Sequence, residues 1–452
     1  MSRYRLRKFL YIFLCFTLIF SSLFGSIQNV NANSTSIENM YAQFFVSTTG
    51  SDSNDGTYEN PFLTIERAQQ AVRQINKDMT GDIYVFIAPG NYYIHDQLNF
   101  DERDSGYNGH KVYFRNLGAP GSAHLIGGDP ITGGWVQTTA SDANGTDYLS
   151  ELPSSAVSKV YKVQLDPEKY DFNQLYIGFK KAVMARTPNK VEDPRFPSFN
   201  GAYLLSTGGS NREMNFKEGD ITPAQIKALQ DAQASGRPEI CQLFVFDCGG
   251  YAFESNTLPI GTIDTATKKL SSPIVPGHPE LNITKYNINA NARYFLQGNI
   301  SFLDTPGEYY YDKVSGMLYY YPTDSDMAAA GGDVNNLNVV VPTTTEIIHL
   351  QGTDKPNISD WGKAPDAAKQ VSNITFDGLT LECTESSNYI VNGWSYGETW
   401  YAGGTAIPNP PPEAESSTQP YYCDYSVRPA YMHGGFTLIN TNNITGRNHR
   451  MA

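Results

Sequence analysis

Two short segments share one pattern: Val371-Ser372-Asn373-Ile374-Thr375-Phe376 and, further on, Thr441-Asn442-Asn443-Ile444-Thr445. In both, asparagine precedes a pair of β-branched residues at the start of a predicted strand. Asparagine tolerates the left-handed backbone of a tight corner, and its side chain can hydrogen-bond the neighbouring turn. Stacked asparagine corners joined by short strands are typical of a parallel β-solenoid. This repeat therefore favours a solenoid over a β-sandwich.

Most of the remaining chain consists of short β-rich runs separated by Gly, Asn, Asp and Pro, and tyrosine contributes 30 residues. Tyrosine and β-branched residues are enriched in strands. The clearest predicted strands are Ile83–Ala88, Lys111–Arg115, His124–Ile126, Tyr161–Leu165, Leu337–Val341, Ile347–Leu350 and Ile374–Leu381. We therefore expect an all-β protein.

Two segments predict helices. One begins with Thr222 as the cap and Pro223 at the first helical position, and it continues through Ile226 and Leu229. The other has Thr64 as its expected N-cap. We expect this second helix to cover the open N-terminal end of the solenoid, because its apolar stripe would otherwise be exposed. The residues expected to be buried there are Ile65, Ala68, Val72 and Ile75.

Composition limits the classes of function. The chain has 452 residues, of which 40% are hydrophobic and 17% charged, so it can bury a sizeable core. Lys and Arg total 33 against 46 Asp and Glu, a net charge of −13. Nucleic-acid binding needs clusters of Lys and Arg that neutralise phosphates. We therefore expect no nucleic-acid partner.

The N-terminus predicts export. Residues 1–32 combine four cations (Arg3, Arg5, Arg7 and Lys8), an apolar run from Phe9 to Phe24, and Val30-Asn31-Ala32, which resembles a signal-peptidase site. We expect cleavage after Ala32, which leaves 29 cations against 46 acids, or −17. An uncleaved anchor helix is the alternative, but the run Phe9–Phe20 is short for a span of about 20 residues. The predicted protein is secreted and has no membrane contact after cleavage.

The cysteines leave two interpretations open. Cys15 departs with the signal, while Cys241, Cys248, Cys383 and Cys423 remain. They can form two disulfides with three possible connectivities, or they can stay as free, partly buried thiols. Neither they nor the 7 histidines show the ligand spacing of a metal site. We predict no metal and no cofactor.

Four motifs carry a family resemblance. Residues 44–68, which contain Gly50-Ser51-Asp52-Ser53-Asn54-Asp55-Gly56-Thr57, and residues 81–93 resemble the opening of secreted right-handed parallel β-helix proteins of pectate-lyase-like fold. Ala185-Arg186-Thr187-Pro188-Asn189 and residues 302–322, with Pro306-Gly307-Glu308-Tyr309-Tyr310-Tyr311-Asp312, are more specific. Together they resemble bacterial carbohydrate-active proteins near glycoside hydrolase families 120 and 141.

The resemblance implies an architecture. Residues 40–135 would form the cap helix and first β-helix rungs, residues 136–335 a β-rich, sandwich-like insertion, and residues 336–452 the resumed rungs. In such proteins later rungs carry the catalytic carboxylates, whereas this sequence stops within what looks like a rung. We therefore expect an N-terminal portion that lacks the catalytic rungs and is weakly active or inactive alone.

The resumed rungs contain the candidate site. Glu382 and Glu385 follow a predicted strand and are the candidate catalytic acids. After them, residues 386–427 form a connection much longer than the usual 2–6 or so residues, and long ordered loops often bind ligands. Trp394, Trp400 and Tyr401 in this loop could stack on sugar rings. The alternative is that the two tryptophans are the small core of a loop packed over the flank.

Two further groups have competing interpretations. Arg186 could hold a sugar hydroxyl or carboxylate, or it could bond carbonyls where the insertion meets the helix. Asp304, Glu308 and Asp312 invite an acid/base interpretation. We instead expect a hairpin turning at Pro306-Gly307, with charged turn residues and acids at the strand edges, because aromatic runs on both sides predict paired strands.

Three functions remain open. The leading one is hydrolysis of a polysaccharide or oligosaccharide by two carboxylates. The second is a non-catalytic carbohydrate-binding or adhesion solenoid, since a fold does not determine a function. A polysaccharide lyase is the third, and it would need a basic residue and calcium-binding acids along one rung, a set that is not visible here.

Overall fold

The computed structural model describes most of the chain from residue 39 onward. The described residues are 39–143, 149, 151–189, 203–210, 213–235, 241–246, 256–271, 287–353, 366–385, 390–391, 394–395 and 435–451. The predicted export signal, with its cleavage after Ala32, lies outside them, as do Cys248, Trp400, Tyr401 and Cys423. None of the helices in the described part has the length and apolarity needed to cross a membrane.

The described chain is mostly β-structure with few helices, as the sequence predicts, and three of its sheets contain only parallel pairings. Sheet A consists, in order, of β1 (Met40–Val46), β2 (Asp82–Ile87), β5 (Val112–Asn116), β25 (Val371–Asp377) and β30 (Thr441–Arg447). Sheet B consists of β3 (Gly90–Tyr93), β6 (Ala123–Ile126), β26 (Leu379–Glu382) and β31 (Arg450–Met451). Sheet C consists of β4 (Leu98–Phe100), β24 (Ile348–Gln351) and β29 (Phe436–Ile439).

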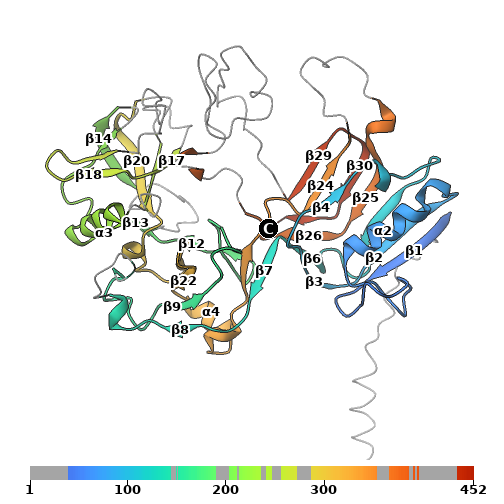
Figure 1. The fold of residues 1–452 in the computed structure, drawn as a ribbon, viewed down its shortest axis with the longest axis horizontal. Coiled ribbons are helices and arrows are strands. Elements are labelled where there is room, and N and C mark those ends of the chain that lie inside the picture. The colour runs from blue at the N-terminus through green and yellow to red at the C-terminus, as the bar shows by residue number, and fades with distance from the viewer. Residues whose placement is uncertain are drawn as a thin grey trace, which may run out of the picture.

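The chain visits these three sheets in a repeating order. From β2 in sheet A it passes to β3 in sheet B and β4 in sheet C, and then back to sheets A and B with β5 and β6. After a long excursion it resumes the order C, A, B twice, first with β24 to β26 and then with β29 to β31. Each circuit is one coil, and the two ends of the chain contribute coils to the same three sheets (Figure 1).

Side chains alternate between the two faces of each strand, and those on the inner face fill the space between the three sheets. Val112 and Phe114 point inward from β5, as Ile374 and Phe376 do from β25. Because these strands pair in register, the rings of Phe114 and Phe376 stack with centroids 5.5 Å apart. Phe100 of sheet C meets both rings edge-on at 5.1 and 5.3 Å. Burying each such ring stabilises the fold by roughly 1.5–3 kcal/mol, so the stacked interior is the main core of this part.

The asparagine corners have the predicted conformation. Asn373 and Asn443 both adopt left-handed backbone, with φ of 58° and 53°. Asn443 Nδ2 donates a hydrogen bond to Asn373 Oδ1 at 2.6 Å, and Asn373 Nδ2 donates to the Gly106 carbonyl at 3.0 Å. Three successive coils are therefore joined at one corner. A side chain at Gly106 would meet the His110 carbonyl oxygen at 2.2 Å, so this first corner admits only glycine.

Helix α2 (Ile65–Ile75) forms where the sequence predicts it and packs against the core of the parallel sheets. The Thr64 hydroxyl accepts the N–H of Arg67 and so begins the helix. Ile65, Ala68 and Val72 are fully buried in the main core, and Ile75 packs against it while partly exposed. The helix thus covers apolar side chains of the first coil that would otherwise face water.

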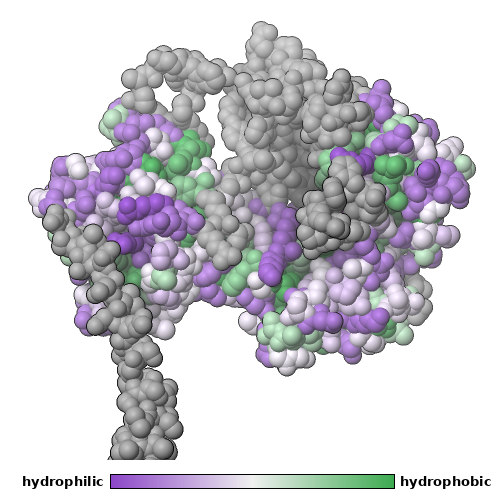
Figure 2. All heavy atoms as spheres, turned by 180° about the vertical axis from the view of Figure 1, so that it is seen from behind, coloured by the Kyte–Doolittle hydropathy of each residue, from purple (hydrophilic) through white to green (hydrophobic). Residues whose placement is uncertain are grey.

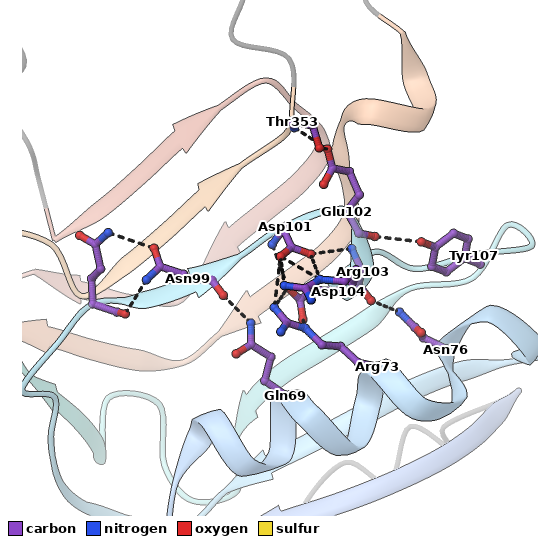
Figure 3. A network of polar contacts seen from close by, with 11 residues as sticks. Gln69, Arg73, Asn76, Asn99, Asp101, Glu102, Arg103, Asp104, Tyr107 and Thr353 are labelled. Carbon is purple, nitrogen blue, oxygen red and sulfur yellow. Dashed lines mark hydrogen bonds and ion pairs between the residues drawn. The ribbon is translucent and has the colours of Figure 1, made fainter. Parts of the chain in front are cut away.

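A polar network ties α2 to the turn after β4 (Figure 3). Arg73 Nε and Nη2 donate to the two carboxylate oxygens of Asp104 at 2.7 and 2.8 Å. Asp104 lies in the 3₁₀ helix η2 (Glu102–Asp104), and its side chain is 1% exposed. Burial raises the pKa of Asp104 even though Arg73 opposes this effect. Nearby, Gln69 Nε2 donates to the Asn99 carbonyl at 2.7 Å, and Asn76 Nδ2 donates to the Arg103 carbonyl at 2.7 Å.

Between β6 and β24 lies a part of the chain built mainly from antiparallel strands, which we call the insertion. Sheet D contains β7 (Gly128–Ile131), β10 (Tyr176–Ile177), β11 (Lys180–Lys181) and β23 (Val339–Pro342). Sheet E contains β8 (Val136–Gln137), β9 (Tyr161–Gln164), β12 (Val183–Met184), β21 (Glu308–Asp312) and β22 (Met317–Tyr320). The eight strands of sheet F are β13 (Arg186–Thr187), β14 (Leu204–Gly209), β15 (Glu213–Asn215), β16 (Gln242–Val245), β17 (Asn256–Pro259), β18 (Thr262–Asp264), β19 (Lys269–Ser271) and β20 (Ala290–Gln297).

The remaining elements are short. The predicted second helix is confirmed as α3 (Pro223–Ala234), capped by Thr222, and α4 (Asp324–Ala329) follows sheet E. Strands β27 (Ile390–Val391) and β28 (Trp394–Ser395) form a small antiparallel pair. Among the described residues, the other 3₁₀ helices are η1 (Asn76–Asp78), η3 (Ala140–Asp142), η6 (Ile300–Phe302), η7 (Val334–Asn336) and η9 (Ala367–Lys369). Seen from behind, the described surface is largely hydrophilic, with scattered apolar patches (Figure 2).

We predict that Asn373→Ala lowers the free energy of unfolding by about 2–3 kcal/mol, because alanine disfavours left-handed backbone and loses the corner hydrogen bonds. Asn373→Gly is the control: it keeps the conformation and should lose only about 1 kcal/mol. Urea unfolding of both variants measures the difference. Equal stability of the two variants would show that the corner backbone is not a constraint.

We predict that Arg73→Met lowers the free energy of unfolding by about 3 kcal/mol near neutral pH, because it leaves the Asp104 carboxylate buried without its cation. The loss should shrink in acid, where protonation neutralises Asp104. Thermal unfolding over a pH series provides the measurement. The matched control, Arg103→Met, removes the charge of a side chain that is 66% exposed and should change stability little. A loss independent of pH would contradict the role of the ion pair.

Candidate functional site

Sheet B meets the insertion at a small buried cluster, which we call the junction. It consists of Ile126 at the end of β6, Tyr176 of β10, Val340 of β23 and Cys383 after β26, with Phe179 packed against them. Cys383 has a left-handed backbone, with φ of 62°, so the chain bends sharply where it leaves sheet B. The candidate acids Glu382 and Glu385 flank this bend.

Glu382 is paired with a histidine. It lies at the end of β26, and its carboxylate Oε1 is 2.6 Å from Nδ1 of His124 on the neighbouring strand β6. The Glu382 side chain is 5% exposed and that of His124 is 29% exposed. The imidazole ring also stacks on Phe179, with centroids 5.9 Å apart. This arrangement orients an acid–base pair whose solvent-facing member is the histidine.

Glu385 has a different environment. Its Oε2 accepts the backbone N–H groups of Asn173 and Gln174 at 2.8 and 3.2 Å. Beside it, the Tyr176 hydroxyl donates to the Thr384 carbonyl at 2.7 Å. These bonds attach the end of sheet B to the insertion, so the contacts of Glu385 are those of a structural anchor. That Glu385 acts catalytically stays a prediction.

Arg186 lies in the insertion. Its guanidinium stacks 3.5 Å from the centroid of the Phe295 ring, and its Nε donates to the Pro188 carbonyl at 2.9 Å. The residue is 8% exposed, and burial lowers the pKa of its guanidinium to about 10. The sequence left open whether Arg186 binds sugar or a carbonyl. The carbonyl contact is present, and sugar binding stays a prediction.

The acids of the PGEYYYD motif are buried. Glu308 is 2% exposed and Asp312 is 0% exposed. The expected hairpin exists, but it is formed by β21 and β22, which join after Asp312, and Pro306-Gly307 lies before its first strand. The predicted position of the turn was therefore wrong, whereas Glu308 and Asp312 do lie at the two ends of a strand, β21, where they are buried. Three consecutive buried tyrosines, Tyr309 to Tyr311, separate the two acids in β21.

Glu308 is surrounded by backbone donors. Its Oε1 accepts the N–H of Arg186 at 3.4 Å, and its Oε2 accepts those of Asp304 and Thr305 at 3.3 Å. Burial, reinforced by the negative charge of Asp304, raises the pKa of Glu308 to about 8. These long hydrogen bonds do not compensate for the loss of water. The two family motifs identified in the sequence thus meet at this carboxyl group.

Several candidates are only partly visible. Trp394 lies in β28, which pairs with β27, and its side chain is not described. Cys241 and Cys383 are free and buried. Burial raises the pKa of the Cys383 thiol to about 12, which makes it a poor nucleophile at neutral pH. In the described part of the chain, no group of three or more His, Cys, Asp or Glu residues gathers as a metal site.

The sequence did not predict the His124–Glu382 pair. The two residues are 258 positions apart, and His124 belongs to no motif. The sequence did indicate that His124 faces outward. Neighbouring side chains of a strand point to opposite faces, and in the predicted strand His124–Ile126 the apolar Leu125 faces inward. Its partner strand could not be chosen without the register.

Comparison with known proteins gives a family match for part of the chain and a similarity in fold. Residues 269–323 match the model of the family described as "GH141 insertion domain". These residues run from β19 to beyond β22 and contain Asp304, Glu308 and Asp312. A solved structure titled "Glycoside hydrolase" is similar in fold, with a TM-score of 0.53 and 18% sequence identity, over 76% of this chain and 51% of that chain. Residues 269–323 are thus similar to a GH141 insertion domain, and the fold is similar to that of a solved glycoside hydrolase.

Two further results complete the comparison. A structure titled "The complex structure of XylC with xylose" is matched at 12% identity over 75% of this chain and 35% of that chain, with a TM-score of 0.28, which is too low to carry an argument. Among curated proteins, none matches the chain. The chain spans about half the length of the glycoside hydrolase that it resembles in fold.

We predict that Glu308 makes the protein less stable as the pH rises. The folded state, with a pKa of about 8, keeps a proton that the unfolded state, with an ordinary pKa of 4.5, releases. The stabilisation is complete below about pH 4.5 and is lost up to about pH 8, at no more than about 1.4 kcal/mol per pH unit. Urea unfolding across this range measures the slope.

Glu308→Gln has no proton to release at this position. The free energy of unfolding of the variant should therefore fall less than that of the wild type between about pH 4.5 and pH 8. Glu213→Gln is the matched control in the insertion, since Glu213 pairs with Lys269 on the surface and should leave the slope unchanged. An identical slope in wild type and Glu308→Gln would exclude the buried proton.

Proposed function

We propose that this chain is a secreted carbohydrate-active protein that acts on a polysaccharide or oligosaccharide by glycoside-hydrolase-like chemistry. The match of residues 269–323 to a glycosidase insertion domain is the observation that carries the proposal. The fold similarity to a glycoside hydrolase supports it. Export rests on the basic and apolar pattern of residues 1–32.

The proposal includes the architecture. Sheets A, B and C would form a right-handed parallel β-helix, and the insertion would interrupt it between β6 and β24. The support is the repeating order of the three sheets along the chain and the exclusively parallel pairing within each. Nearly all parallel crossover connections are right-handed, which favours that hand.

The junction would be the place of chemistry. His124 is the more exposed member of its pair, so a saccharide bound there would meet the imidazole first. Glu382 would hold the ring by accepting the Nδ1 proton, and it would stabilise the imidazolium when the ring takes up a second proton. The aromatic residues Trp394, Trp400 and Tyr401 would contribute sugar-stacking surfaces, and Arg186 a further polar contact.

One observation favours the alternative, a carbohydrate-binding scaffold without catalysis. Two-carboxylate hydrolysis needs a second acid at roughly 5–9.5 Å from the first. Among the four described strands of sheet B, Glu382 is the only acidic residue. A pair of facing carboxylates therefore cannot come from this sheet alone, and slow turnover is expected.

We predict slow hydrolysis of at least one member of a panel of aryl glycosides and oligosaccharides. Glu382→Gln should reduce it about 100-fold, because loss of a positioned acid–base group has effects of this size. Glu385→Gln is the comparison, since its contacts are with backbone; any loss should follow weakened folding, which a thermal unfolding curve detects.

The outcomes separate the candidates. Wild-type turnover in Glu382→Gln would exclude this acid from the reaction. An absence of turnover on every substrate, with saccharide binding retained in isothermal titration calorimetry, would replace the hydrolase by the binding scaffold.

A further inference from the structure

The outer surface of sheet A carries an unusual set of charges. Strand register places Phe86, Arg115, Asp377 and Arg447 in one outward row across β2, β5, β25 and β30. The neighbouring row contains Tyr84 and Tyr113, whose rings stack in parallel with centroids 4.6 Å apart. Sheet A does not carry the junction, which lies between sheet B and the insertion.

Two guanidinium groups share one carboxylate in this row. Arg447 Nη2 donates to Asp377 Oδ2 at 3.0 Å, while Arg115 Nε lies 3.5 Å from the same oxygen. The other oxygen, Oδ1, accepts the side-chain N–H of Asn448 at 2.8 Å. Both carboxylate oxygens of Asp377 therefore have partners. The row contains two arginines and one aspartate, so its net charge is positive.

Both arginines are accessible. The side chain of Arg115 is 42% exposed and that of Arg447 is 52% exposed, whereas that of Asp377 is 5% exposed. The carboxylate thus lies beneath the two guanidinium groups and orients them from below. A surplus cation at a fixed position is notable in a chain whose net charge is −13.

The two tyrosines add neutral donors. Burial raises the pKa of both Tyr84 and Tyr113, so their hydroxyl groups stay protonated at neutral pH. One face of each ring is covered by the other ring, so a sugar cannot stack between them. The hydroxyl groups at the ring edges of the two tyrosines can donate hydrogen bonds. The nearest further acid on these strands is Asp82, which accepts the N–H of Lys111 at 2.8 Å.

We propose that this arginine face (Arg115, Asp377, Arg447, Tyr84 and Tyr113) binds a carboxylate group of an acidic saccharide chain. The planar fork of arginine matches a carboxylate, and an orienting acid beneath it reduces the ordering cost of binding. Tyrosine hydroxyls beside the guanidinium groups suit the hydroxyl groups of a sugar. This inference rests on the proposed carbohydrate-active function and adds a second, charge-selective site to it.

The two guanidinium groups converge on one place. Arg115 and Arg447 lie on strands separated only by β25, so their backbones are about 9.5 Å apart, or two strand spacings. Their side chains approach each other over β25, where Arg115 Nε and Arg447 Nη2 lie 3.5 and 3.0 Å from the same Asp377 oxygen. The two groups therefore form one cationic site, which suits a single carboxylate of a uronic-acid chain.

The test is binding of an oligogalacturonide to the mature protein, measured by isothermal titration calorimetry at low salt. Its fully methyl-esterified form has the same sugars without the charge, and dextran sulfate supplies charge without carboxylates. We expect binding of the acidic form only, about tenfold weaker in Arg115→Gln and in Arg447→Gln, because a charge-assisted hydrogen bond has this order of effect. Arg115→Lys, which keeps the charge without the fork, should also bind more weakly.

The control variant is Lys159→Gln, which removes one exposed cation from the insertion and should bind as the wild type does. Equal binding of the methyl ester, equally tight binding of dextran sulfate, or full affinity in both glutamine variants would each overturn the inference. The measurement needs no turnover, so inactivity towards glycosides leaves it intact. Loss of acidic-saccharide binding with intact hydrolysis would reject this inference alone.

Discussion

The parallel sheets depend on one constraint: each coil must place its corner directly above the corner of the coil before it. Asn373 and Asn443 satisfy it by adopting the same left-handed backbone and by hydrogen bonding to each other. Once the corners coincide, the strands that follow are in register. Register then decides that Phe114 and Phe376 stack inside while Arg115 and Asp377 align outside. Interior packing and surface charge are thus two results of the same alignment.

This constraint explains which features the sequence could predict. An asparagine corner, an N-cap at Thr64 and a Thr222-Pro223 helix start are local signals, and the structure confirms each. The inward alternation of the strands is equally local. From these signals the mostly β-structure, the parallel pairing on both sides of the insertion and the buried face of the cap helix could be expected.

Contacts between distant segments were not predictable in the same way. The partner of Glu382 is His124 on a strand that precedes the whole insertion, and only the pairing of β6 with β26 brings them together. Glu385 looked equivalent to Glu382 in sequence, yet a bend at Cys383 directs it to backbone donors of the insertion. Likewise, buried Glu308 accepts the backbone N–H of Arg186, which is 122 residues away. By residue type alone, Glu382, Glu385 and Glu308 were all possible acid–base groups. Their different surroundings in the structure distinguish them.

The chain leaves the coils through β7 and returns to them through β23, and these two strands pair side by side along their full length. The departure and return points are therefore held together by their own hydrogen bonds. Anything attached beyond this pair, long or short, leaves the distance between β6 and β24 unchanged. Because β7 and β23 hold these two points together, the insertion can change in size and surface without disturbing how the coils stack. A different module could also be grafted onto the same two strands.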